Sequence, residues 1–155
     1  MNIRFCQTED QERWIQLNRE FMDYEVEAAS PWGASADIPD ETFGRTYQEA
    51  LRNPQLVTLF MIEYEGEVIG FANLMSIYSV WAQGKALILD DLFIREEHRR
   101  KGIGKEAVEF IEEYARNNGY RRLQFQSEFT NPDAKKFYEA IGYMPIDMHF
   151  YVKYV

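Results

Sequence analysis

A short segment in the second half of the chain combines glycine with basic side chains, and these residue types suit the binding of an anion. Residues 99–104 read RRKGIG, with Gly102 and Gly104 after three cations. Glycine lets a backbone approach a ligand closely, and the unpaired amides at a helix N-terminus attract phosphate. The segment therefore predicts a phosphate-binding loop, although an ordinary strand-to-helix turn has the same two-glycine spacing.

Two adjacent carboxylates, Asp90 and Asp91, interrupt an otherwise apolar run over residues 87–94, LILDDLFI. Apolar residues on both faces are typical of a central strand, where a carboxylate costs free energy unless it is paired or faces a solvated cleft. Successive side chains of a strand point to opposite faces, so the two cannot face the same way without a β-bulge. We expect one of them to face a cleft. A carboxylate satisfied by neighbouring amides is the structural alternative.

A third group lies near the C-terminus, where residues 131–143 read NPDAKKFYEAIGY. The segment predicts a short helix, on which Ala134, Phe137, Tyr138 and Ile141 share one face. For an isolated helix, the ordinary interpretation of such a tyrosine is core packing with its hydroxyl hydrogen-bonded. Taken alone, this helix predicts no activity.

The periodicity of apolar residues predicts the elements that position these groups. Strands are predicted over residues 3–7, 55–65, 67–78, 85–94, 121–127 and 147–155, and helices over residues 10–27, 41–52, 102–118 and 132–141. Their order predicts an α/β protein with a mixed sheet. Four aromatic or aliphatic residues of the first helix are expected in the core: Trp14, Leu17, Phe21 and Tyr24. The intervening loop over residues 28–40 contains Trp32, which either caps a ligand pocket or anchors the loop.

The charge of the chain is unevenly distributed. The formal net charge is -9; residues 1–80 carry 14 acidic and 5 basic side chains, whereas residues 81–155 carry 12 of each. This balance argues against general nucleic-acid binding, which needs clustered cations. The acidic half suits a cationic ligand, and the solubility of an acidic surface explains it equally well.

Cysteine, histidine and apolar content exclude other classes. Cys6 is the single cysteine, and His98 and His149 form no metal-binding motif, so we expect neither a disulfide framework nor a metal site. No apolar run reaches the roughly 18 residues of a membrane span, and the first residues do not resemble a secretory leader. We expect a soluble, cytoplasmic protein of one domain that binds no membrane.

Together, the three groups resemble the GNAT-type N-acetyltransferase superfamily. Its members carry an R/Q-x-x-G-x-G/A loop after a central strand, which Arg99, Gly102 and Gly104 match. Their later pattern N-x-x-A-x-x-F-Y-x-x-x-G-F/Y is matched at six positions: Asn131, Ala134, Phe137, Tyr138, Gly142 and Tyr143. Residues 78–94 also look like the corresponding segment of the spermidine/spermine and related diamine N-acetyltransferases, which carry Glu-Asp where this chain has Asp90 and Asp91.

The resemblance implies a fold and a donor substrate. The fold is a single N-acetyltransferase domain over residues 1–155, with a mixed central sheet of about six to seven strands, helices on both faces and splayed central strands. Acetyl-CoA is the implied acyl donor, with no metal. The residues implied to bind it are Leu92, Phe93, Ile94, Arg99, Arg100, Lys101, Gly102, Ile103, Gly104, Lys105, Asn131 and Phe137.

The resemblance also implies catalytic roles. Asp90 or Asp91 would accept the proton of the attacking amine through a water, and Tyr138 would protonate the departing thiolate. A backbone amide of Phe93 or Ile94 would stabilise the developing oxyanion. Because both reactants are held together, no covalent enzyme intermediate is required.

The implied acceptor is a primary amine of a small cationic molecule similar to a diamine or polyamine. An aminoglycoside, an amino acid and a peptide N-terminus are the alternatives, and the loop over residues 28–40 is expected to decide among them. A non-catalytic acyl-CoA sensor would keep Gly102 and Gly104 but lack a working acid and base. Resembling proteins are commonly homodimers, and the tyrosine-rich end HFYVKYV is the expected contact surface.

Overall fold

The computed structural model describes residues 1–25, 37–127, 129 and 131–153, which form two compact units, residues 1–125 and 126–155. Each unit is described by itself. Trp32 and most of its loop lie outside the described residues. No helix within the described ranges is long and apolar enough to cross a membrane.

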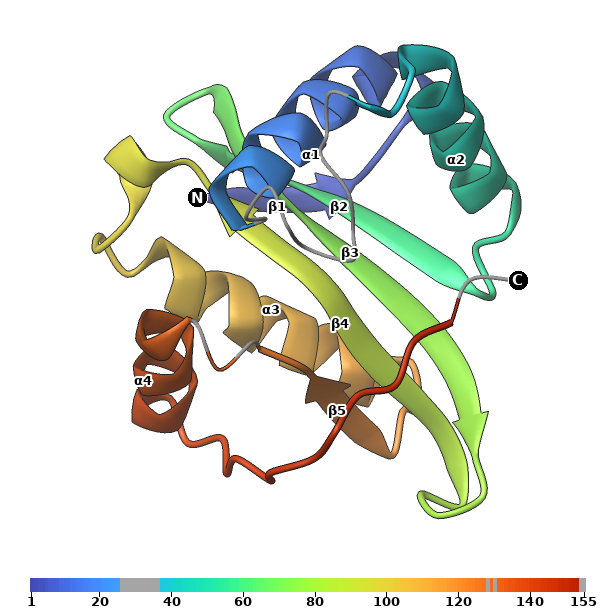
Figure 1. The fold of residues 1–155 in the computed structure, drawn as a ribbon, viewed down its shortest axis with the longest axis vertical. Helices are drawn as coiled ribbons and strands as arrows, with labels where there is room; N and C mark the ends of the chain where they lie inside the picture. The colour runs from blue at the N-terminus through green and yellow to red at the C-terminus, as the bar shows by residue number, and fades with distance from the viewer. Residues whose placement is uncertain (26–36, 128, 130, 154–155) are drawn as a thin grey trace. The chain divides into compact units, whose positions relative to one another are not determined.

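The larger unit contains one mixed sheet with the strand order β1-β2-β3-β4-β5 (Figure 1). The strands are β1 (Asn2–Phe5), β2 (Val57–Tyr64), β3 (Glu67–Ser79), β4 (Gly84–Ile94) and β5 (Arg122–Phe125). The first four pair antiparallel, and β5 pairs parallel to β4. β4 is therefore an interior strand, as its apolar faces predict.

Helices cover both faces of this sheet, which confirms the layered prediction (Figure 1). They are α1 (Gln11–Glu25) and α2 (Asp40–Arg52) on one face and α3 (Ile103–Asn117) on the other. On β2, Leu59 and Met61 pack in a core with α1 and α2, whereas Phe60 belongs to a core with α3. This alternation follows from the two-residue period of a strand.

The predicted core residues of α1 are mostly confirmed. Trp14 and Leu17 are buried, and the ring of Phe21 packs against Phe71 and Phe93. Tyr24 is the exception, because 58% of it is exposed. It lies in the last turn of α1, where its ring instead supports the guanidinium of Arg99 at 4.1 Å.

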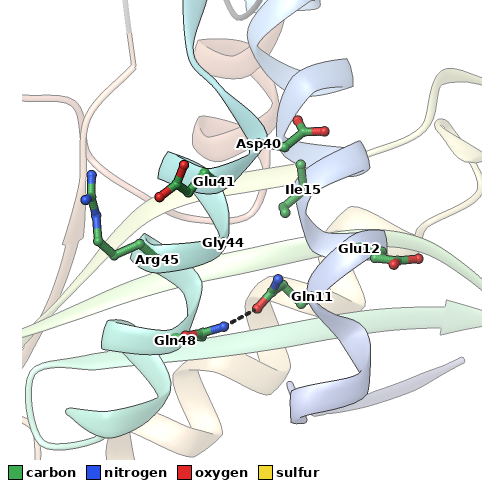
Figure 2. A pocket seen from close by; sticks show the side chains of 8 residues that line it. All are labelled: Gln11, Glu12, Ile15, Asp40, Glu41, Gly44, Arg45 and Gln48. Atoms are coloured by element: carbon green, nitrogen blue, oxygen red, sulfur yellow. Dashed lines mark hydrogen bonds between the residues drawn. The ribbon is translucent and has the colours of Figure 1, made fainter.

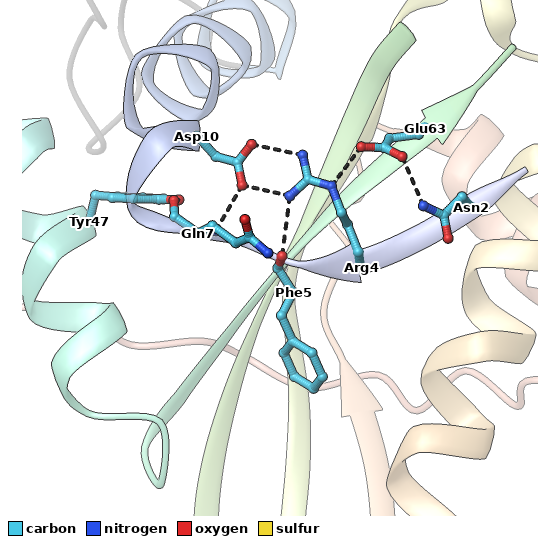
Figure 3. Close-up of polar contacts among 7 residues, drawn as sticks. All are labelled: Asn2, Arg4, Phe5, Gln7, Asp10, Tyr47 and Glu63. Atoms are coloured by element: carbon cyan, nitrogen blue, oxygen red, sulfur yellow. Dashed lines mark hydrogen bonds and ion pairs between the residues drawn. The ribbon is translucent and has the colours of Figure 1, made fainter. Parts of the chain in front are cut away.

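A group of ion pairs holds the edge strand β1 to its neighbours (Figure 3). The Arg4 guanidinium lies 2.6 Å from Asp10 before α1 and 2.6 Å from Glu63 on β2. The Asp10 carboxylate also accepts a hydrogen bond from the amide of Gln7 at 2.7 Å. The hydrogen bond from the Arg4 guanidinium lowers the pKa of Asp10. The start of α1, and so the placement of Trp14 over the sheet, is thereby tied to β1 and β2.

The smaller unit contains the helix α4 (Pro132–Ala140). Asn131 caps it, because its side-chain oxygen accepts a hydrogen bond from the amide of Ala134 at 3.0 Å. Pro132 stands at the first helical position, which tolerates the missing N–H. The predicted face is confirmed, since Ala134, Phe137 and Tyr138 are half-buried while their helical neighbours are exposed.

The prediction of six to seven strands is wrong for the described residues, which form five. The missing strand is the one predicted near the C-terminus: residues 147–153 form no strand in the described chain. Alternation of apolar and polar side chains is necessary for a half-buried strand, but a strand also needs a neighbour for its backbone groups. Here the alternating apolar side chains, including Met148 and Phe150, are exposed.

Candidate functional site

The site begins at a β-bulge in the middle of β4. Asn73 on β3 pairs with Asp91, whereas the next residue of β3, Leu74, pairs with Leu89. Asp90 is therefore an extra residue with no cross-strand partner. A one-residue shift of this kind moves all following side chains to the opposite face of the sheet.

This phase change is visible in the two cores. Before the bulge, Leu87 and Leu89 belong to the core on the α3 face. After it, Phe93 belongs to the core on the α1 face, and Asp91 is hydrogen-bonded to Asn73 beneath α1. Without the bulge, the odd-numbered residues would stay on the α3 face. The bulge therefore delivers Asp91 to the face covered by α1.

Asp91 lies in a largely desolvated position and accepts one hydrogen bond from an uncharged donor. The side-chain amide of Asn73 donates to Asp91 Oδ2 at 2.8 Å. Burial raises the pKa of Asp91 to about 6, the Asn73 hydrogen bond opposes this change, and the charge of Asp90 adds to it. A carboxylate with a pKa near 6 is ionised at neutral pH and is a stronger base than an exposed aspartate.

Asp90 is more exposed than Asp91, and partial burial raises its pKa as well. Within the described residues no lysine or arginine forms an ion pair with either aspartate. Two neighbouring carboxylates without a cation repel each other and lack the charge compensation that partial burial normally requires. The pair is thus suited to hold a positively charged ligand.

Within residues 1–125 as the structure describes them, β4 has an open edge beyond the bulge. Its pairing with β5 ends at Leu89 and Phe125, while its pairing with β3 continues to Ile94. The amide of Arg95 donates to Ile69 on β3 at 3.0 Å. Backbone groups alternate in direction along an antiparallel strand, so the amide of Phe93 also faces β3 and that of Ile94 faces the open edge. This agrees with the expected separation of the two strands and favours Ile94 over Phe93 as a donor to a ligand.

The predicted phosphate loop has a suitable backbone. Gly102 is the N-cap of α3 with φ of +85°, a left-handed conformation that favours glycine. The first intrahelical bond joins the Glu106 amide to the carbonyl of Gly102, so the amides of residues 103–105 precede the helical hydrogen bonds. Among the residues that the structure describes, no side chain caps this helix end. The loop therefore offers unpaired amides to an anionic group such as a phosphate.

The five basic side chains between residues 95 and 105 have different contacts. Arg95 is held by both oxygens of Glu20, at 2.8 and 2.7 Å, and by Glu67. Arg99 turns back toward β4, where its Nε donates to the carbonyl of Ile94 at 2.7 Å. The remaining three are exposed on or beside the loop: Arg100, Lys101 and Lys105. These three are best placed to meet phosphate charge.

The second motif lies in the smaller unit. Asn131 serves as the cap of α4, and the Tyr138 carbonyl accepts a hydrogen bond from the amide of Tyr143 at 3.0 Å, which closes the end of the helix. The Phe137 and Tyr138 rings contact each other at 4.9 Å. Several residues of the motif thus shape this helix and present Phe137 and Tyr138 on its least exposed face.

Three residues around Asp91 were not predicted as part of a site: Trp14, Asn18 and Asn73. Trp14 Nε1 donates to Asn73 Oδ1 at 3.0 Å, and Asn73 Nδ2 donates to Asn18 Oδ1 at 3.3 Å. A signal existed in the sequence, because Asn73 is the one polar residue in the run FANLM of an apolar strand. Periodicity does not show what such a residue contacts.

A separate surface groove of about 650 Å³ lies between α1 and α2 (Figure 2). Gln48 bridges it by a hydrogen bond to Gln11 at 3.0 Å. It is lined by polar and charged side chains, including Glu12, Glu41 and Arg45. None of the predicted site residues lines this groove. In the described ranges no cluster of three or more metal-binding side chains occurs either.

Comparison with known proteins identifies the family of the chain. The model of the Acetyltransferase (GNAT) family matches residues 14–143. The chain is 32% identical over 143 residues to the uncharacterized N-acetyltransferase YhfO of Bacillus subtilis, with 92% of this chain and 89% of that protein covered. It is 22% identical to the D-amino-acid N-acetyltransferase HPA3 of Saccharomyces cerevisiae, over 91% of this chain and 83% of that protein.

The fold matches solved acetyltransferases. The aminoglycoside N-acetyltransferase AAC(6')-Iy in complex with CoA superimposes with a TM-score of 0.78 at 18% identity, covering 99% of this chain and 93% of that one. A possible acetyltransferase from Clostridium difficile 630 gives a TM-score of 0.82 at 17% identity, covering 99% and 97%. The chain belongs to the GNAT family and is an acetyl-CoA-dependent N-acetyltransferase.

Proposed function

We propose that this enzyme acetylates a primary amine of a small cationic acceptor similar to a diamine or polyamine. The observation that carries the proposal is the pair Asp90 and Asp91, which share a bulge and have no described cationic partner. An acceptor with a second ammonium group would compensate this charge, whereas an acceptor that carries a carboxylate would be repelled by it.

Asp91 is the proposed base. An alkylammonium has a pKa of about 10, and the unshared pair needed for attack appears only when it loses a proton. Proton transfer from the ammonium to an exposed aspartate is unfavourable, because their pKa values differ by about six. The raised pKa of Asp91, about 6, reduces this difference to roughly four. The small fraction of neutral amine that results is consumed by attack on the thioester, which draws this unfavourable proton transfer forward. Asp90 is the proposed partner of the acceptor's other cation.

The same proposal assigns the rest of the reaction. The ammonium first gives one proton to Asp91, directly or through one water, and the neutral amine then attacks the thioester carbonyl. As the N–C bond forms and the C–S bond breaks, the nitrogen loses its second proton to water, which replaces the proton that Tyr138 gives to the thiolate. The amide of Ile94 would stabilise the charge that develops on the thioester oxygen. The Tyr138 hydroxyl would protonate the departing thiolate, a role that rests on the motif of α4. The proposed single domain covers residues 1–155, and the family match over residues 14–143 supports it.

The donor would be held by the loop and the open edge of β4. Exposed Arg100, Lys101 and Lys105, with the amides of residues 103–105, would bind the pyrophosphate. Leu92 and Ile94 would offer backbone groups to the pantetheine amides. Because Arg99 is bonded to Ile94 O, its proposed part is to fix the end of β4. Asn131 and Phe137 complete the proposed set through α4.

The test is thiol release from acetyl-CoA across diamines, polyamines, aminoglycosides, D- and L-amino acids and peptides. We expect the highest kcat/KM for diamines or polyamines. Asp90→Asn should mainly raise KM for these acceptors, and Asp91→Asn should lower kcat by about 10² to 10⁴. A preference for amino acids would overturn the proposed acceptor. Activity on none of them would favour an acyl-CoA sensor.

A further inference from the structure

A row of neutral polar side chains crosses the core from α1 to β4. Trp14 and Asn18 lie one turn apart on α1, and Asn73 lies on β3 between them and Asp91. All three are buried, with exposed fractions of 5%, 6% and 9%. Buried polar groups cost free energy unless they are hydrogen-bonded, so this row is expected to serve either packing or the site.

The donors and acceptors of this row fix the orientation of Asn73. An indole N–H can only donate, so the Trp14 contact at 3.0 Å must meet the side-chain oxygen of Asn73. Asn18 donates its Nδ2 to the carbonyl of Trp14 at 2.7 Å, so its oxygen faces Asn73. The amide nitrogen of Asn73 therefore faces Asp91, and one of its two hydrogens is left for Oδ2 of that carboxylate.

We propose that Asn73 is a positioning residue for acetyl transfer, which holds Oδ2 of Asp91 by a hydrogen bond and leaves Oδ1 to take up the proton of the amine. The proposal rests on the proposed role of Asp91 as base. In the described structure no side chain donates to Oδ1. Trp14 and Asn18 act one step further away, because they prevent the Asn73 amide from rotating its oxygen toward the carboxylate.

The neighbours of Asp91 make this contact important. On β4 itself, Asp90 is the charged group that acts on Asp91. From β3 the uncharged side chain of Asn73 contacts Asp91, and the α1 side chains that reach Asn73, Trp14 and Asn18, are uncharged as well. Asn73 is therefore the described group that favours the ionised form of Asp91. Without it, burial and Asp90 would keep the carboxyl protonated to higher pH, and a protonated carboxyl cannot serve as a base.

The test compares the titration of Asp91 in Asn73→Leu and in wild type, monitored in the free enzyme by the carbon-13 NMR signal of the side-chain carboxyl. A hydrogen bond to a charged group is worth about one to two pH units, so the midpoint should rise by that amount. The midpoint of the acidic limb in the pH profile of kcat/KM should rise by the same amount. Thr58→Val is the matched control: Thr58 lies on β2, next to β3, and the change removes its part-buried hydrogen bond to Tyr114 on α3, so it should move neither midpoint.

Trp14→Phe is a second variant that keeps a ring beside Phe43 and Tyr47 but removes the indole N–H. It should raise the midpoint by a smaller amount, and it tests the proposal if Asn73→Leu does not fold. Unchanged NMR midpoints in the folded variants would overturn the positioning role. If the NMR midpoint rises but the midpoint of the acidic limb of kcat/KM does not, the hydrogen bond from Asn73 is supported and the role of Asp91 as the base is overturned. The two proposals therefore fail in different ways.

Discussion

Asn73 and Asp91 are cross-strand partners on β3 and β4, and the register slips by one residue directly beside this pair. The slip places Asp90 outside the ladder and turns Asp91 toward the α1 face, where Asn73 donates to it. One irregularity in the sheet thus brings a carboxylate, its hydrogen-bond donor and a second carboxylate into one place.

The first prediction concerns stability, because Asp91 lies where a charge is costly. Its pKa is about 6 in the folded protein and about 3.9 in an unfolded chain, so the folded state binds the proton more tightly. The unfavourable contribution of Asp91 to wild-type stability should therefore disappear as the pH falls from about 6 to 4. Asp91→Asn should be more stable than wild type at about pH 8, by about 1 to 3 kcal/mol.

Urea unfolding at about pH 8 and pH 4 measures this difference, which should largely vanish at the lower pH because wild-type Asp91 is then protonated. Asp37→Asn removes an exposed carboxylate and serves as the control, with little change at either pH. An Asp91→Asn protein less stable than wild type at about pH 8 would contradict the assigned burial.

The second prediction separates backbone strain from ligand binding in the loop. Gly102 and Gly119 stand at opposite ends of α3 with φ of +85° and +71°. Alanine at either position should cost about 1 kcal/mol, because a left-handed backbone disfavours a Cβ. Only Gly102→Ala should also raise KM for acetyl-CoA, by about tenfold, since the loop would shift away from its phosphate-binding conformation. Equal KM values in the two variants would remove Gly102 from the donor site.

The third prediction tests Tyr138 as the acid. Tyr138→Phe keeps the ring and its contact with Phe137 but removes the hydroxyl. We expect kcat to fall by about 10² while KM for acetyl-CoA stays near wild type, because the proton is needed only as the C–S bond breaks. Steady-state kinetics of Tyr143→Phe, whose ring lies 6.1 Å from that of Tyr138, provide the control. If both variants turn over like wild type, another group or water protonates the thiolate.

Local patterns in the sequence predict much of the fold. The helix over residues 102–118 and the strand over residues 85–94 were predicted to within one residue at each end, because their periodicity and terminal glycines are local signals. The strand predicted at residues 147–155 was wrong for its described part, 147–153, because pairing is not a local property. The sequence likewise did not show that Arg95, just before this basic segment, forms an ion pair with Glu20 on α1.

For the site, the sequence by itself determined the chemical groups: a glycine-rich loop, two adjacent carboxylates and a tyrosine in a family motif. Which aspartate meets which neighbour was decided only by the tertiary structure. The bulge arises from the register between β3 and β4, and the orientation of Asn73 arises from Trp14 and Asn18 on a helix more than fifty residues away in the chain. Residue types follow from the sequence, whereas the face to which Asp91 points depends on how distant strands pair.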